Sequence, residues 1–306
     1  MQLQSLAKLA GNLLVLGSFA FLFYLLSTLD FSTLKPLFSP SWIPIMISFS
    51  VLFSFLYFMM AEGWRRLLAL VSRRRLDKRV IATYLKTVIY KYAPGNVFHF
   101  LGRHSLTKTH GLSHKSIAFA NGVEILMQLF SVGSLIMIGV IFFDFSLDFG
   151  KYFELSKNKI LLAFLLLFVV VFVVLLKKEY RQVLFQKESF WVLLRVFVYQ
   201  LFFLLGSTST LVLVYVVLLD VPFTFVMYLH TIFAASIAWL LGFIVPGAPG
   251  GVGIREAILV LLLPAIMMVS SELVLAGALI YRVITILGEG LTYIWAKLLE
   301  NKEVSR

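Results

Sequence analysis

The chain has 306 residues, of which 60% are hydrophobic and only 14% are charged, and its mean hydropathy is +0.96. About a quarter of the residues of a soluble globular domain are charged, so this composition indicates an integral membrane protein. Because cysteine is absent, disulfides, thiolate metal sites and cysteine nucleophiles are excluded. The net charge of +12 comes from basic residues beside apolar stretches, which favours contact with anionic lipid headgroups over binding of nucleic acid.

Six apolar stretches are long enough, or nearly so, to cross a hydrocarbon core, which takes about 20 residues of helix. They cover residues 9–29, 42–64, 116–143, 160–176, 189–219 and 272–296. The first stretch has neither a basic n-region nor a small-residue cleavage site, so we expect a mature span rather than a cleaved signal.

Two further apolar regions are interrupted by proline and glycine. Region 80–106 is broken at Pro94 and Gly95, and region 223–264 is broken at Pro246, Pro249, Gly250 and Gly251. Proline cannot continue a helix, and glycine permits a sharp reversal of the chain. Each arm of the first region has only about a dozen residues, which is too few to span a bilayer. We therefore predict two re-entrant helical hairpins with these residues at their tips.

Basic residues are distributed unequally between the two sets of loops. With the N-terminus inside, 17 of the 27 Lys and Arg residues flank the spans on the cytoplasmic side and four lie in outer loops. The positive-inside rule then predicts a multi-pass protein of the inner cell membrane with both termini in the cytoplasm. In this orientation the first hairpin has both ends inside and the second has both ends outside.

The two interruptions also indicate an internal repeat. Residues 93–97 read APGNV and residues 248–252 read APGGV, 155 positions later. So short a match also arises by chance, but the order of the spans and the opposed charges of the flanks favour a repeat. The predicted fold is one all-α polytopic membrane domain, residues 1–306. Its halves, about 1–155 and about 156–306, each have two spans, a hairpin and a third span, and such inverted repeats are typical of secondary transporters.

Residues 90–97, Glu124 on the following span, and residues 246–257 together resemble the membrane domain of bacterial lysylphosphatidylglycerol synthase/flippase proteins. The resemblance covers nearly the whole chain and implies a membrane domain that translocates lipid. The soluble aminoacyl-transferase domain of the two-domain members has no counterpart in this sequence, so lysyl transfer to lipid is not expected. The resemblance to stand-alone members implies polyprenyl-phosphate-linked sugars or other anionic lipids as substrates.

Seven residues near the interruptions are candidates for binding the substrate, namely Tyr92, Asn96, Arg103, Glu124, Arg255, Glu256 and Arg282. An unpaired charge at the centre of a bilayer costs at least about 2.5–3.5 kcal/mol, so the charged members should face a cavity or a partner. Arg255 can offer a bidentate fork to a lipid phosphate at the start of a helix whose dipole also favours anions. An internal pair between Arg255 and Glu256 is the alternative.

The other candidates also have two interpretations each. An ion pair between Arg282 and Glu124 would link the two halves as a gate, a relay or a static contact. Arg103 is predicted nearer the cytoplasmic rim, where it either receives headgroups or extends to the interface. Tyr92 and Asn96, at the first tip, either coordinate a headgroup or form the turn.

The sequence favours a lipid transporter (flippase) over an enzyme. It shows no spacing typical of a catalytic triad or a metal site, so no catalytic residue, metal or cofactor is expected. Two alternatives stay open. One is a membrane-embedded transferase or hydrolase that uses Glu124, Glu256 or His99 on lipid-linked substrates, and the other is an accessory subunit of a glycosyltransferase. The expected partners are the membrane and an anionic lipid or lipid-linked phosphate, together with a glycosyltransferase or a second copy of the chain.

Overall fold

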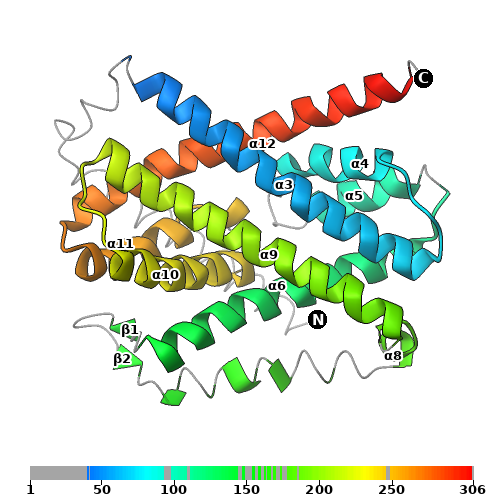
Figure 1. Ribbon diagram of the computed structural model, residues 1–306, viewed down its shortest axis with the longest axis horizontal. Coiled ribbons are helices and arrows are strands. Elements are labelled where there is room, and N and C mark those ends of the chain that lie inside the picture. The colour runs from blue at the N-terminus through cyan, green and yellow to red at the C-terminus, as the bar shows by residue number, and fades with distance from the viewer. Residues whose placement is uncertain are drawn as a thin grey trace, which may run out of the picture.

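The computed structural model describes residues 40, 42–92, 98–108, 111–143, 147–148, 154–155, 158–159, 162, 164–166, 168–169, 173, 178–184, 186–245 and 249–304. This part of the chain is almost entirely helical (Figure 1). Two strands of two residues each, β1 (Leu147–Asp148) and β2 (Glu154–Leu155), form an antiparallel pair. The predicted span 9–29, most of the span 160–176, and Pro94, Gly95, Asn96 and Pro246 lie outside the described residues.

Five of the described helices are long and apolar enough to cross a membrane. They are α3 (Trp42–Ser72), α6 (His114–Phe142), α9 (Lys187–Leu213) with its π-helical continuation η3 (Val214–Leu218), α10 (Phe225–Ile244) and α12 (Ser271–Val304). At 1.5 Å per residue, the 31 residues of α3 extend about 46 Å, which exceeds the hydrocarbon core of roughly 30 Å. Helices with the properties of spans therefore occur at four of the six predicted positions.

The outer surface of these helices is apolar. Large side chains such as Leu52, Phe202 and Ile294 are more than half exposed, on α3, α9 and α12 respectively. In a soluble protein a surface of this kind would drive association, whereas on helices of this length it suits contact with lipid tails. The interior, in contrast, contains fully buried Trp64 and Tyr215 together with several ionisable groups.

Short helices fill the space between the long ones. At the end of the molecule where α12 terminates lie α4 (Arg79–Thr87), the 3₁₀ helix η2 (Val88–Tyr92) and α5 (Phe98–Lys108) (Figure 1). The 3₁₀ turn η4 (Pro249–Gly251) and α11 (Ile254–Met267) follow α10 at the opposite end. With 9 to 14 residues, α4, α5 and α11 are too short to cross a bilayer.

Helix α10 is longer than the arm of a re-entrant hairpin, which crosses only half of a membrane. It begins after Thr224, whose hydroxyl accepts a hydrogen bond from the Met227 backbone N–H at 3.1 Å, and it continues for 20 residues. No proline interrupts the sequence until Pro246, so nothing stops the helix earlier. The break in region 223–264 therefore separates a helix of membrane-crossing length from a short one, rather than two short arms.

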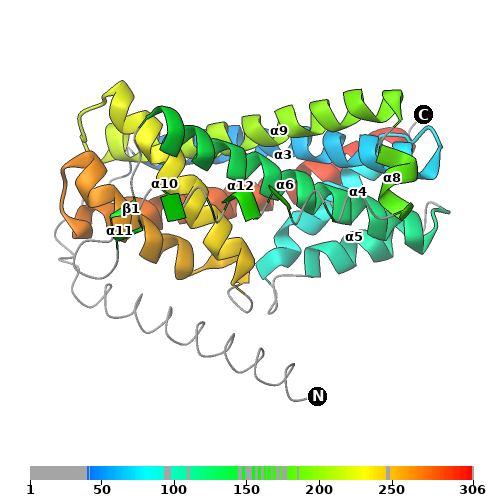
Figure 2. The ribbon, with the colours of Figure 1, turned by 90° about the horizontal axis from the view of Figure 1, so that it is seen from below.

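The two interrupted regions meet near the middle of the molecule. Figure 2 shows α5 and α11 approaching each other from opposite ends of the long axis, and η2 contacts η4 between them. At this contact Gly250 has a φ of +60°, and a Cβ added to it would stand 3.0 Å from Cε1 of Tyr92. Glycine is needed here because an ordinary side chain would be strained and would collide with the Tyr92 ring.

Candidate functional site

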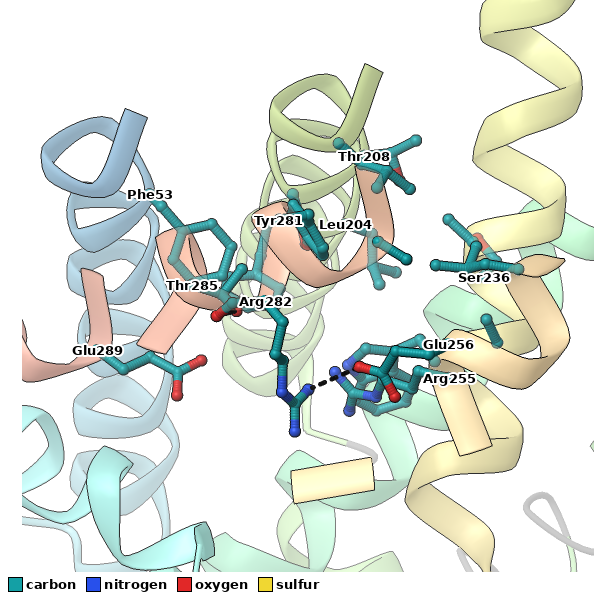
Figure 3. Close-up of a pocket in the computed structure, with 18 of the residues that line it drawn as sticks. Phe53, Leu204, Thr208, Ser236, Arg255, Glu256, Tyr281, Arg282, Thr285 and Glu289 are labelled. Atoms are coloured by element: carbon teal, nitrogen blue, oxygen red, sulfur yellow. Dashed lines mark hydrogen bonds and ion pairs between the residues drawn. The ribbon is translucent and has the colours of Figure 1, made fainter. Parts of the chain in front are cut away.

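Two adjoining cavities lie between the helices. The first, of about 70 Å³, is bordered by Arg255, Glu256, Arg282 and Glu289 (Figure 3), and the second, of about 80 Å³, by His99, Arg103 and Glu124. Five residues line both, namely Tyr57, Lys91, Phe203, Trp239 and Arg255. A buried water needs about 10–15 Å³ of such space, so each cavity has room for a few waters or one small polar group.

Arg103 and Glu124 form a buried ion pair at the second cavity. An Arg103 Nη1 donates to Glu124 Oε2, and the two side chains are only 3% and 5% exposed. The Tyr84 hydroxyl donates to the other carboxylate oxygen at 2.8 Å, and its ring centroid lies 3.8 Å from Arg103 Cζ. Arg103 is therefore paired inside the protein and does not extend to the interface. Helix α5 packs against α4 and α6, which turns this side chain toward the carboxylate on α6.

Arg282 does not pair with Glu124, contrary to expectation. Its Nη2 donates to the Gly250 carbonyl oxygen at 3.1 Å, and its Nη1 lies 3.8 Å from Glu256 Oε1 (Figure 3). Helix α12 packs against α11, so Arg282 faces the start of α11, while Glu124 on α6 is occupied by Arg103. Arg103 and Arg282 therefore each pair with a carboxylate from their own half of the chain.

Glu256 caps the start of α11 and also faces the cation Arg282. Its Oε2 accepts a hydrogen bond from the Gly253 backbone N–H at 2.7 Å, which satisfies one of the free donors at the start of α11. The other oxygen faces Arg282. The alternative pair between Arg255 and Glu256 is not formed, because neighbouring residues on a helix point in different directions.

Arg255 has no carboxylate partner within the described part of the chain. Its Nε is inaccessible to solvent and makes no hydrogen bond, and its Cζ lies 5.7 Å from the centroid of the Trp239 ring. The side chain crosses Gly242 and Gly251, where an added Cβ would come within 2.6 Å of its atoms. Small residues thus make room for an arginine that borders both cavities and is left with donors to offer.

Lys91 and Glu289 form a further polar cluster that was not among the candidate residues. Lys91 Nζ lies 2.5 Å from Glu289 Oε1, and the Tyr57 hydroxyl donates to the same oxygen at 2.9 Å. Glu289 is 2% exposed, and its Oε2 has no hydrogen-bond partner. Helical periodicity does point to Glu289, since it follows Arg282 by seven residues, two turns on the same face of α12.

Basic groups outnumber acidic ones around the two cavities. Lining residues include the four cations Lys91, Arg103, Arg255 and Arg282 and the three carboxylates Glu124, Glu256 and Glu289. This leaves an excess of one positive charge, which corresponds to the unpaired Arg255. A buried charge without a counter-ion is costly, so an anion at this position would stabilise the cavity.

No model of a protein family matches the chain, and no curated protein matches it. The resemblance to lysylphosphatidylglycerol synthase/flippase proteins therefore rests on the sequence motifs alone.

The Tyr92 side chain lies between Lys91, which pairs with Glu289, and Arg282, which faces Glu256. Its ring centroid is 5.4 Å from Lys91 Nζ and 5.6 Å from Arg282 Cζ, and its ring packs on Gly250. Among the residues predicted at the hairpin tips, Tyr92, Pro249, Gly250 and Gly251 thus come together beside the cavities. Chemically, the arrangement can bind an anion through guanidinium donors and hold it against aromatic faces.

Proposed function

We propose that the protein is a flippase-like transporter that moves an anionic lipid between the leaflets of the inner membrane. The observation that carries this proposal is Arg255, a cation between two small cavities that lacks a carboxylate partner within the described residues. A phosphate group would accept both arms of its guanidinium and would balance the excess charge. Phospholipids and polyprenyl-phosphate-linked lipids share this phosphate.

The arrangement of the short helices supports alternating access. In our proposal α4, η2 and α5 form a hairpin that enters from the cytoplasmic side. The segment from α10 to α11 is its inverted counterpart, with α10 extended beyond the length of a half-membrane arm. The contact of Tyr92 with Gly250 lies between the two, next to the cavities. Rocking of one half against the other about this contact would open the site to each leaflet in turn. Both termini are then cytoplasmic, in accordance with the positive-inside rule.

Transport fits the carboxylates better than hydrolysis or group transfer does. Glu124 is held by Arg103 and Tyr84, and Glu256 caps α11 and faces Arg282. A general acid or base must reach a reacting group with a free oxygen, which Glu124 and Glu256 do not offer. Glu289 does keep a free Oε2 beside the first cavity, so a hydrolase or transferase would have to use Glu289. A transporter leaves the mass of the lipid unchanged, whereas a hydrolase or transferase would change it.

Liposomes with reconstituted protein test the proposal. Labelled phosphatidylglycerol and a polyprenyl phosphate are followed between leaflets, and product masses are measured. We expect Arg255→Gln to slow transport roughly ten- to hundred-fold, since a hydrogen bond to a charged group is worth about 1.5–3 kcal/mol. Arg181→Gln, on an exposed position of α8 (Lys178–Leu184), is the matched control and should transport normally. Equal rates for wild type and Arg255→Gln, or a change in lipid mass, would refute the proposal.

A further inference from the structure

A polar groove lies at the end of the molecule where α3 ends and α9 begins (Figure 1). It measures about 420 Å³ and runs between the end of α3, residues 74–76 and the start of α9. Its polar lining consists of four arginines and one glutamate, Arg65, Arg66, Arg74, Arg75 and Glu188, and the remaining lining is apolar. It shares no lining residue with the two central cavities, so it is a separate site.

The arginines of this groove are only partly neutralised. Arg65 and Arg66 both contact the single carboxylate of Glu62, each at 2.7 Å. Arg74 donates to a backbone carbonyl, that of Gly111 at 3.1 Å, and Arg75 is exposed and makes no ion pair with any described residue. With Glu188 included, four cations face two carboxylates, so the groove keeps an excess of two positive charges.

Contacts to the backbone hold the groove in shape. Arg65 Nη1 donates to the Leu76 carbonyl at 2.8 Å, which fixes the loop after α3 over the helix end. The bond from Arg74 to Gly111 ties the same loop to the turn before α6. The wall that carries Arg74 and Arg75 is therefore attached at two points.

The start of α9, which lines the groove through Glu188 and Val192, also carries exposed aromatic residues. Phe190 and Trp191 are 59% and 55% exposed in its first turn, and Arg195 is exposed one turn further along. Exposed aromatic residues at a helix end are typical of a membrane interface, and an arginine within an apolar helix extends toward headgroups. Figure 1 shows the start of α9 and the loop after α3 at the same end of the molecule. A ligand of the groove would thus have its charged part among arginines and its apolar part along α9.

We propose that this groove binds the phosphate headgroup of an anionic phospholipid from the adjoining leaflet, at a site distinct from the transport cavity. Basic pockets at the ends of membrane helices bind such headgroups. Guanidinium groups recognise phosphate with paired hydrogen bonds. Exposed Trp191, which follows the lining residue Glu188 by three residues, gives the acyl chains a surface that a soluble phosphate would not use.

Native mass spectrometry of the detergent-solubilised protein tests the site, with phosphatidylglycerol and phosphatidylcholine of identical acyl chains as probes. Wild type is expected to retain phosphatidylglycerol over phosphatidylcholine. The double variant Arg74→Gln/Arg75→Gln should bind phosphatidylglycerol roughly 30-fold more weakly, because two basic contacts are lost. The control Arg73→Gln/Lys78→Gln removes the same charge from exposed positions of the same loop that do not line the groove, and it should bind as wild type does.

Further variants and a competing anion distinguish lipid bound in the groove from lipid bound in the central cavities. Arg255→Gln should keep the adduct, and an excess of inorganic phosphate should not displace it. Arg75→Gln alone, at an exposed position without an ion pair, gives a variant that folds even if the double variant does not. The proposal fails if phosphatidylcholine is retained equally, if both double variants lose the lipid equally, if only Arg255→Gln loses it, or if inorganic phosphate displaces it.

Discussion

Replacing Glu124 by glutamine should destabilise the protein strongly, because it leaves Arg103 as a buried cation without a counter-ion. The two side chains are 3% and 5% exposed, so bulk solvent does not replace the lost contact. Removing one member of a buried pair costs about 3–5 kcal/mol, whereas replacing both members by apolar or neutral groups costs far less. For a chain of this size about 2 °C of unfolding temperature corresponds to 1 kcal/mol, which predicts a fall of roughly 6–10 °C.

Thermal unfolding in detergent, followed by tryptophan fluorescence at one fixed scan rate, measures this fall. The double variant Arg103→Met/Glu124→Gln should recover most of it, since no unpaired charge remains. Asp77→Asn breaks the exposed pair of Asp77 and Arg79, whose side chains are 60% and 55% exposed, and should lower the unfolding temperature by little. If Glu124→Gln shifts the unfolding temperature no more than Asp77→Asn does, the buried ion pair assigned to α5 and α6 is wrong.

Three further predictions follow from the polar contacts and turns. Lys91→Met should lower the unfolding temperature by leaving Glu289 unpaired, and Lys91→Met/Glu289→Gln should restore it; the same melting experiment decides. Gly250→Ala should slow lipid transport, because the added Cβ would press on the Tyr92 ring. Gly111→Ala is the control: its φ of +69° is similar, but no atom lies within 4 Å of the added Cβ. It should add backbone strain of about 1–2 kcal/mol without slowing transport. Burial, and then the adjacent His114, lower the pKa of His104, so its protonation opposes folding. Stability should therefore fall as the pH drops below about 6.5, and this fall should be smaller in His104→Gln, as melting at several pH values would show.

Sequence patterns predicted four of the long helices, because a lipid bilayer cannot satisfy the hydrogen bonds of an exposed backbone. A run of about 20 apolar residues has few alternatives to a membrane helix, and α3, α6, α9 and α12 coincide with predicted spans. Proline and glycine act through their own backbone geometry, so the interruption around Gly250 could be recognised locally. The candidate residues Arg255, Glu256 and Arg282 were predicted at the site for a related reason, since charges within apolar segments must lie near polar partners or a cavity.

The pairing of these charges was decided only by the tertiary structure. Whether Arg282 meets Glu124 or Glu256 depends on the rotation and packing of α12 against α11, and a sequence does not specify these angles. Lys91 and Glu289 lie 198 positions apart, and they meet only because η2 packs against α12. Hydrophobicity and backbone sterics act over a few neighbouring residues and can be read along the chain. Ion pairs between distant segments are determined by the packing of whole helices. That packing also leaves Arg255 without a carboxylate partner among the described residues.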